Sequence, residues 1–145
     1  MRNVGLLKDC AFIDGAWLDG DRRLDVYNPA DGSVVGSVPD LGAMEAAVAV
    51  SAAHRAFDTW RTTPAKERAT TLRRWSSLML DNKEDLARLM TAEQGKPLAE
   101  AAGEVAYAAA FLEWFSEEVR RVTGDILTPH QPGGGEGIRR WPRGK

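Results

Sequence analysis

Few side chains in this 145-residue sequence have the type and spacing that catalysis requires. The single cysteine, Cys10, has no neighbouring histidine or cluster of positive charge to lower its pKa, so we interpret it as a small core residue and not as a nucleophile. The two histidines, His54 and His130, stand alone and match no metal-ligand spacing. Residues 133–137 are glycine-rich, but no helix follows and no Lys–Ser pair closes a phosphate-binding loop, which favours a hairpin turn.

Three glutamates, Glu93, Glu100 and Glu104, flank one predicted turn between helices. Solvated helix faces usually explain carboxylates in this position, and these three do not cluster as zinc ligands would. The Gly-Lys-Pro run at 95–97, inside that turn, lacks the upstream glycine of a phosphate-binding loop and fits a helix boundary. Judged by these residues alone, the chain is a globular domain without a visible active site.

Composition narrows the class of protein. Apolar residues make up 43% of the sequence and charged residues 28%, a mixture typical of folded globular proteins. The 19 basic and 21 acidic residues give a net charge of −2, so we expect neither nucleic acid nor an anionic membrane as a partner. No apolar run approaches the roughly 20 residues of a membrane span. With one cysteine and no secretory signal after Met1, the sequence predicts a soluble cytoplasmic protein.

The opening third of the sequence reads as short strands separated by turn signals such as Asp14-Gly15 and Asp19-Gly20. These strands are expected to form one small antiparallel sheet. They are Ala11–Ile13, Trp17–Leu18, Asp25–Tyr27 and Val34–Val38.

From Leu41 onward the apolar residues recur with the period of helices. On the first helix one stripe is expected to face a core, and it consists of Ala46, Val50, Ala53, Phe57 and Trp60. A second helix is expected to begin at Pro64 with Thr63 as its N-cap. Its inward residues are expected to be Leu72, Trp75 and Met79.

Asn82 is the predicted N-cap of a third helix, whose apolar face holds Leu86, Leu89 and Met90. Gly95 ends this helix, and Pro97 begins a fourth that reaches Val122.

The fourth helix has two apolar faces, which indicates burial on two sides and therefore more surrounding protein than the preceding residues easily supply. One face holds Ala101, Val105, Ala108, Leu112, Phe115 and Val119, and the other holds Tyr107, Phe111 and Trp114. After Gly124 the pattern predicts an extended arm with a glycine-rich turn. Such an arm is an open sheet edge, which pairs with another chain or promotes aggregation.

Six segments follow one another in a characteristic order: Phe12–Trp17, Val26–Gly32, Ala56–Arg61, Lys66–Arg73, Leu89–Glu100 and Gly103–Phe115. Together they resemble the opening part of aldehyde dehydrogenases, and the later ones resemble the succinate-semialdehyde branch in particular. Each segment alone is weakly specific, but their order and spacing are those of the family. The resemblance extends from about Ala11 to Thr128.

The resemblance implies an α/β fold of the aldehyde dehydrogenase type, here incomplete, with short antiparallel strands, four helices and an extended β arm. It assigns residues 1–124 to the N-terminal part of the cofactor-binding domain and residues 125–145 to the start of an oligomerisation arm. In the family, a cysteine thiolate attacks the aldehyde, hydride passes to NAD or NADP, and a glutamate activates water. The sequence contains no match to these catalytic or cofactor-binding residues, so we expect this chain alone to be inactive.

The resemblance also gives roles to residues that are present. Glu93 matches an acidic residue that, with the backbone carbonyls of Val26 and Tyr27, helps to hold a structural monovalent cation in some relatives. A plain helix-end carboxylate is an equally good interpretation of Glu93.

On the fourth helix, Glu104, Tyr107, Ala108 and Phe111 match positions that line the substrate tunnel of the complete enzyme. A tunnel-facing position would explain a glutamate among apolar neighbours. The arm that starts at Asp125 matches a hairpin that pairs with a neighbouring subunit, which implies a homo-oligomer.

The tail departs from the family pattern at Arg143, where relatives have an apolar residue, whereas Pro142 and Gly144 fit. The leading hypothesis is the N-terminal part of an oxidoreductase that acts on a small-molecule aldehyde. The alternative is a noncatalytic interaction module that keeps the outer layer of this fold and pairs through its arm. The sequence leaves both open, and it does not separate NAD from NADP.

Overall fold

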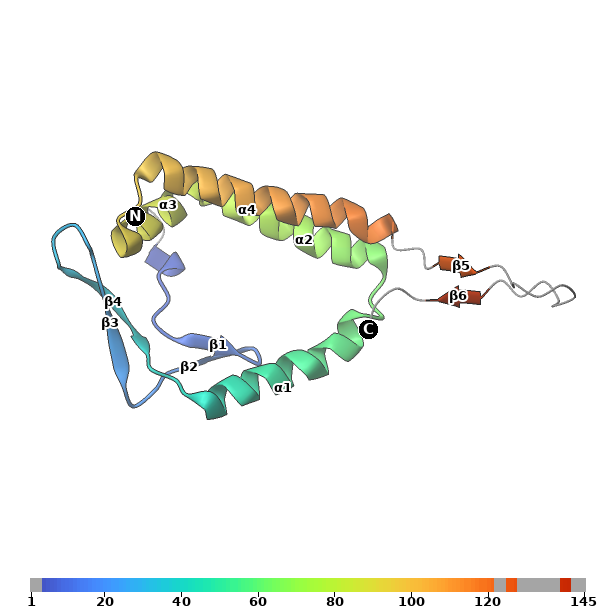
Figure 1. Ribbon diagram of the computed structural model, residues 1–145, viewed down its shortest axis with the longest axis horizontal. Coiled ribbons are helices and arrows are strands. Elements are labelled where there is room, and N and C mark those ends of the chain that lie inside the picture. Colours follow the sequence, from blue (N-terminus) through green and yellow to red (C-terminus); the bar gives the residue numbers. More distant parts are fainter. Residues whose placement is uncertain (1–3, 122–124, 128–138, 142–145) are drawn as a thin grey trace, which may run out of the picture.

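The computed structural model describes residues 4–121, 125–127 and 139–141, and it has the predicted mixed α/β arrangement of short strands followed by four helices (Figure 1). The strands are β1 (Ala11–Ile13), β2 (Ala16–Leu18), β3 (Arg23–Tyr27), β4 (Val34–Pro39), β5 (Asp125–Leu127) and β6 (Arg139–Trp141). The helices are α1 (Ala43–Trp60), α2 (Ala65–Asp81), α3 (Lys83–Gln94) and α4 (Leu98–Glu118). Short 3-10 turns, η1 (Val4–Leu6) and η2 (Val119–Arg121), lie before β1 and after α4.

The first four strands form two separate antiparallel hairpins, where the sequence predicted one small sheet. β1 pairs with β2 around Asp14 and Gly15, whose φ angles of 51° and 81° are both positive. An Asp-Gly pair favours a two-residue hairpin turn that needs a left-handed backbone at both positions. β3 pairs with β4, and the register shifts between Val26 and Tyr27. Each hairpin closes on itself, because β2 and β3 are not paired in the described structure.

β5 and β6 form a third antiparallel pair, with Asp125 opposite Trp141 and Leu127 opposite Arg139. This pairing agrees with the extended arm predicted after Gly124. The glycine-rich turn predicted at 133–137 lies outside the described residues.

Two helix boundaries are set by the residues that the sequence singled out. Gly95 caps the C-terminus of α3 with a left-handed φ of 73°, and Pro97 stands at the N-cap of α4. Asn82 occupies the single position between α2 and α3, as C-cap of one and N-cap of the other. Its side-chain nitrogen donates to the carbonyl of Leu78 at 2.8 Å, so the side chain caps the end of α2 and not the start of α3.

The prediction for Thr63 is wrong. Its hydroxyl donates to the carbonyl of Thr59 at 3.0 Å, which directs it back to the end of α1. α2 begins at Ala65 without a side-chain cap, and Pro64 is its N-cap residue. A threonine hydroxyl can satisfy either helix, and here the free carbonyl groups at the end of α1 are its partners.

The helical core is built from small residues. α2 and α4 lie side by side in opposite directions, and α3 packs against α4 (Figure 1). Ser76 of α2 is buried and donates to the carbonyl of Ala109 in α4 at 2.9 Å. The buried apolar side chains of the described residues are Ala52, Ala69, Ala87, Ala101, Val105 and Ala109. No leucine, isoleucine, methionine or aromatic side chain is fully buried among them, so the helices approach closely but enclose little apolar surface.

The α1 stripe, defined as Ala46, Val50, Ala53, Phe57 and Trp60, does not face a core in this chain. Val50 is 70% exposed and Trp60 is 40% exposed. α1 contacts β1, and the groove between the β1–β2 hairpin and α1 is lined from α1 mainly by other residues, Ala49, Ala52 and Ala56. The predicted helical period is right, but no described element covers the stripe.

Two further predictions of inward residues need correction. Trp75 of α2 is exposed, and Leu72 and Met79 are half-buried. The buried residues of α2 are instead Ala69 and Ser76. On α4 the first predicted face shifts by one residue, since Ala109 is buried where Ala108 was expected and Phe115 is exposed. Tyr107, Phe111 and Trp114, the second predicted face of α4, are exposed as well, so the close contact between the described helices is made by small residues.

Candidate functional site

A groove between α3 and α4 brings together most of the residues that the sequence nominated for function. Its volume is about 530 Å³, with a mainly apolar lining. Glu93 of the cation candidate lines it, and so do Glu104, Tyr107 and Ala108 of the tunnel candidates. Phe111 does not line this groove. The other lining residues are Met79, Leu86, Leu89, Met90, Gln94 and Val105.

Phe111 belongs to a second, smaller groove of about 290 Å³, lined by residues of α4. Tyr107 lines both grooves, and the remaining residues of the second are Ala110, Trp114 and Phe115. The rings of Tyr107 and Phe111 meet edge to face with their centroids 4.9 Å apart, and the Phe111 and Phe115 rings stack at 6.5 Å. A spacing of four residues on one helix produces this row of aromatic rings. The row offers an apolar wall, as a substrate tunnel requires, but no group that can perform chemistry.

Glu104 is paired with Lys96, which lies in the turn between α3 and α4. The Lys96 ammonium donates to the Glu104 carboxylate, and the Lys96 side chain is only 25% exposed. This ion pair explains a glutamate among apolar neighbours without a tunnel. The sequence signal was available, because Lys96 stands just before α4 and its long side chain can reach along the first turns of that helix.

The residues of the cation candidate lie on two elements that contact each other, α3 and β3. Glu93 is exposed in the last turn of α3, and Gly95 lies against Pro29, which follows β3. The register shift between Val26 and Tyr27 interrupts the regular hydrogen-bond ladder at the two carbonyls in question. A carboxylate and backbone carbonyls are suitable ligands for a hard cation. Among the described residues, no three Asp, Glu, His or Cys side chains approach as a metal-binding group.

Cys10 has the environment of an unreactive thiol. Desolvation, followed by the neighbouring Asp9 carboxylate, raises the pKa of Cys10, and the thiol lies 3.6 Å from an Asp9 carboxylate oxygen. A higher pKa leaves less thiolate at neutral pH, and the thiolate is the nucleophile. The prediction that Cys10 is a small core residue needs correction, because Cys10 is half-buried and not part of the core.

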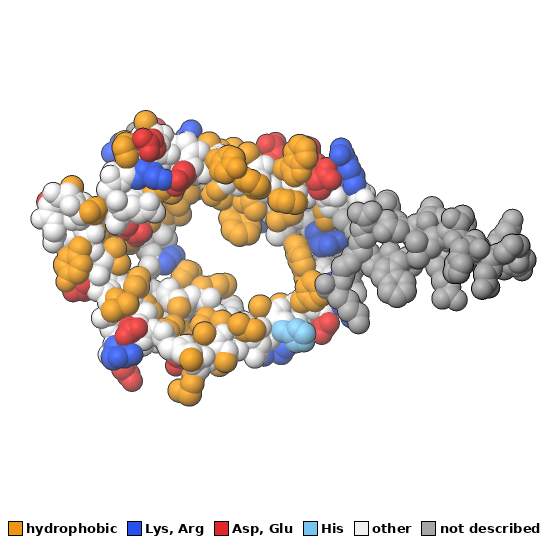
Figure 2. All heavy atoms as spheres, viewed as in Figure 1, with side chains coloured by type: hydrophobic (Ala, Val, Ile, Leu, Met, Phe, Trp, Pro, Cys, Tyr) orange, Lys and Arg blue, Asp and Glu red, His pale blue; other side chains and the backbone are white. Residues whose placement is uncertain are grey.

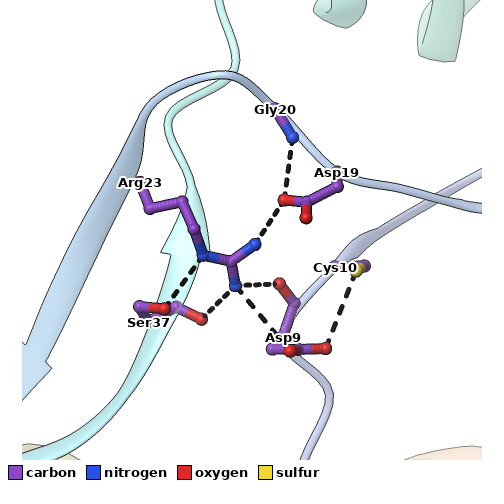
Figure 3. A network of polar contacts seen from close by, with 6 residues as sticks. All are labelled: Asp9, Cys10, Asp19, Gly20, Arg23 and Ser37. Atoms are coloured by element: carbon purple, nitrogen blue, oxygen red, sulfur yellow. Dashed lines mark hydrogen bonds and ion pairs between the residues drawn. The ribbon is translucent and has the colours of Figure 1, made fainter.

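Arg23 links the two N-terminal hairpins (Figure 3). Its guanidinium donates to the Ser37 hydroxyl at 2.9 Å, to the Ser37 carbonyl at 3.0 Å and to the Asp9 carbonyl at 2.8 Å. It also pairs with the Asp19 carboxylate, which accepts the Gly20 N–H at 2.8 Å. Backbone and side-chain acceptors from both hairpins thus meet at one cation, which indicates a structural role.

The described residues do not fit a dinucleotide cofactor. Such a site uses a glycine-rich turn between a strand of a parallel sheet and a helix N-terminus. The strands described here form only two-stranded antiparallel pairs. Within the same part of the chain, no helix combines the length and hydrophobicity needed to cross a membrane.

Comparison with known proteins extends these observations. The model of the Aldehyde dehydrogenase family matches residues 17–145. The glutarate-semialdehyde dehydrogenase of Pseudomonas aeruginosa is 54% identical over 134 residues, which make up 91% of this chain and 28% of that protein. The NADP+-dependent succinate-semialdehyde dehydrogenase of Escherichia coli is 53% identical over 133 residues, or 90% of this chain and 28% of that protein. The crystal structure of succinate-semialdehyde dehydrogenase from Burkholderia pseudomallei matches with a TM-score of 0.86 and 50% identity, covering 90% of this chain and 28% of that one.

A mixed α/β chain with this order of hairpins and helices, matched over nearly its whole length, belongs to the aldehyde dehydrogenase family. It spans about 28% of the length of these relatives and corresponds to their N-terminal part.

Proposed function

We propose that this chain is the N-terminal part of an oxidoreductase that oxidises a semialdehyde with NAD+ or NADP+, and that succinic semialdehyde, converted to succinate, is its substrate. The observation that carries the proposal is the identity of 53–54% to two semialdehyde dehydrogenases across about nine-tenths of the chain. The cysteine that would form the thiohemiacetal, the glutamate and the cofactor site belong to parts of the family that these residues do not match. Cys10, with its raised pKa, is a poor substitute for that nucleophile.

In this proposal the residues of α4 shape the substrate tunnel and perform no chemistry. Tyr107 and Ala108 form its wall, Phe111 continues the apolar surface, and Glu104 is held to one side by Lys96. Glu93 and the carbonyls of Val26 and Tyr27 form the monovalent cation site. These roles rest on the shared groove and on the contact between α3 and β3.

The remaining expectations belong to the same proposal. Residues 1–124 form part of the cofactor-binding domain, and residues 125–145 begin an arm through which the cytoplasmic enzyme assembles as a homo-oligomer. The β5–β6 pair supports the arm. A second function, that of a noncatalytic interaction module, is favoured by the large apolar side chains that the described residues leave exposed.

A chimera tests the proposal directly. This chain replaces the matching N-terminal segment of the Escherichia coli succinate-semialdehyde dehydrogenase, and reduction of NADP+ is followed with succinic and with glutaric semialdehyde. We expect turnover of both compounds, with a lower KM for succinic semialdehyde than for glutaric semialdehyde. A folded chimera that forms no NADPH with either compound would refute the assignment to this reaction.

Two variants of the chimera test the tunnel. Tyr107→Ala should raise the KM for the semialdehyde, because Tyr107 lines both grooves. Leu98→Ala is the matched control, since Leu98 is also an exposed apolar residue of α4 but lines neither groove. Equal effects of the two substitutions would show that Tyr107 does not line the tunnel.

The 145-residue chain alone should form no NAD(P)H with either semialdehyde. A rate of NAD(P)H formation that Cys10→Ala abolishes would contradict this prediction.

A further inference from the structure

The groove between α3 and α4 has a charge that opposes the substrate proposed above. Among the described residues that line it, the charged ones are Glu93 and Glu104, and both are acidic. Succinic semialdehyde bears a carboxylate at the end opposite its aldehyde, so it would enter this groove as an anion. Like charges repel, and they repel more strongly beside apolar surface than in open water. Such a groove favours a neutral aldehyde over an anionic one unless a positive charge offsets these glutamates.

Lys96 lies beside one of the two glutamates. It stands in the turn between α3 and α4, and its ammonium donates to the Glu104 carboxylate. The Lys96 side chain is 25% exposed and that of Glu104 is 50% exposed, so the pair is partly shielded from water. Figure 2 shows hydrophobic side chains along the middle of the α2–α4 pair and acidic and basic side chains at its ends. The pairing leaves a net charge of −1 at the groove, where the two carboxylates alone would give −2.

The choice of partner connects Lys96 with the groove. Glu100, in the first turn of α4, is four residues nearer to Lys96 in the sequence than Glu104. The ammonium nevertheless pairs with Glu104, which lines the groove, whereas Glu100 does not line it. Lys96 is also not among the described lining residues. Its charge therefore acts on the groove through Glu104 and not through contact with a ligand.

We propose that Lys96 is a specificity-determining residue, which admits aldehydes with a carboxylate at the far end to this groove by neutralising Glu104. This inference rests on the proposed function, because it takes the groove as part of the path of the semialdehyde. A pair that only steadied the α3–α4 turn would affect charged and neutral aldehydes alike. Charge compensation affects the charged aldehyde alone.

The test compares two aldehydes of equal carbon number in the chimera described above. Succinic semialdehyde carries the carboxylate, and butanal is its neutral counterpart. Lys96→Met keeps an apolar side chain and removes the charge. We expect the KM for succinic semialdehyde to rise about three- to tenfold, because the unpaired Glu104 carboxylate repels the carboxylate of the substrate in a partly shielded groove. The KM for butanal should change by no more than about twofold.

Two further variants separate charge from other effects. Lys96→Arg keeps the positive charge and should keep the preference for succinic semialdehyde. Lys66→Met makes the same change in net charge on α2, 13 residues before Met79, which lines the groove. That spacing is about 20 Å of helix, more than twice the Debye length of about 8 Å at physiological salt, so both KM values should stay unchanged. Added salt should reduce the effect of Lys96→Met, because it screens the repulsion.

A double variant decides how Lys96 acts. If Lys96 compensates Glu104, removing both charges with Lys96→Met and Glu104→Gln should return the KM for succinic semialdehyde to within about twofold of the unsubstituted chimera. A double variant that stays as impaired as Lys96→Met would show that the ammonium binds the substrate directly, and it would overturn the proposal. Equal rises in KM for succinic semialdehyde and butanal would overturn it as well, because they would limit the pair to support of the turn.

Failure of this inference differs from failure of the proposed function. An active chimera in which Lys96→Met has no selective effect refutes this inference alone. If the chimera forms no NADPH, calorimetric binding of γ-hydroxybutyrate and of n-butanol replaces the KM values, since these ligands differ in the same charge and need no turnover. Lys96→Met should then weaken the binding of γ-hydroxybutyrate alone. An equal effect on both ligands, or no effect on either, would overturn the proposal.

Discussion

Gly95 offers a sharp test of how α3 is fixed against the β3–β4 hairpin. Its φ of 73° is left-handed, and a Cβ atom at this position would lie 2.8 Å from Pro29 Cγ. Ordinary carbon–carbon contacts begin at about 3.5 Å, so Gly95→Ala needs a shift of at least about 0.7 Å or a deformed turn. The substitution therefore adds two costs, one from the backbone conformation and one from the contact.

The two costs can be separated because Gly32 has the same backbone conformation without the contact. Its φ is 72°, and a Cβ atom there would meet no atom within 4 Å. Gly32→Ala should reduce the free energy of unfolding by about 1–2 kcal/mol, the cost of a left-handed alanine. Gly95→Ala should reduce it by a further 1–3 kcal/mol or so, the usual range for overpacking.

Urea unfolding, monitored by circular dichroism, measures the loss of unfolding free energy in both glycine variants. The protein concentration should be low enough to prevent association. Pro29→Ala removes the Cγ atom, so the double variant with Gly95→Ala should recover most of the extra loss in a double-mutant cycle. Equal losses for the two glycine variants, or no recovery in the double variant, would show that the contact with Pro29 does not hold α3 in place. The candidate cation site would then lose its support, since its ligands lie on these two elements.

Three further predictions concern single side chains. Trp60→Ala should cost the isolated chain less than about 1 kcal/mol in a thermal melt, because Trp60 is already 40% exposed, whereas a loss of 3–5 kcal/mol would mean that the α1 stripe is a core face after all. Hydrogen bonds from the Ser33 hydroxyl and amide lower the pKa of Asp31, so their stabilising effect is complete above the unfolded pKa of about 3.9 and is lost as the pH falls through the folded value. The Ser33 amide resonance should accordingly move only at pH below about 4, and it should not titrate in Asp31→Asn. Because desolvation and the Asp9 carboxylate raise the pKa of Cys10, its alkylation by iodoacetamide at neutral pH should be slower than that of a cysteine peptide and faster in Asp9→Asn, and the reverse order would contradict the assigned causes.

The features that the sequence predicted correctly are those decided by a few neighbouring residues. Gly95 takes the left-handed conformation because only glycine adopts it without strain, and Pro97 precedes α4 because it cannot continue α3. The turn at Asp14 and Gly15 follows from the same local chemistry. These effects need no tertiary context, which is why the strands and the four helices were found in their places.

The features that could not be predicted depend on what packs against each helix. The α1 stripe has a clear period, but the period does not say whether a partner is present in the same polypeptide. The Thr63 hydroxyl stands between free carbonyl groups at the end of α1 and free N–H groups at the start of α2. The path of the backbone through this turn decides that it donates to the Thr59 carbonyl. For the candidate site, the motif order nominated the residues of α4 and Glu93, but the pairing of Glu104 with Lys96 was overlooked, although a lysine just before a helix can reach the first turns of that helix.

The small buried side chains should make this chain sensitive to different substitutions from those that damage most domains. In most domains, trimming a large core side chain is the most damaging change, whereas here Ala87, Ala101 and Ala109 are at most 1% exposed and every aromatic side chain described is accessible. A saturation screen of the isolated chain should therefore give an inverted pattern, in which enlarging these alanines is severe and shortening an aromatic residue is nearly silent. In the same screen of a full-length relative, shortening the matching aromatic residues should be damaging, as it is in most domains. The aromatic positions at which the two screens differ would identify the surfaces that the rest of that relative covers.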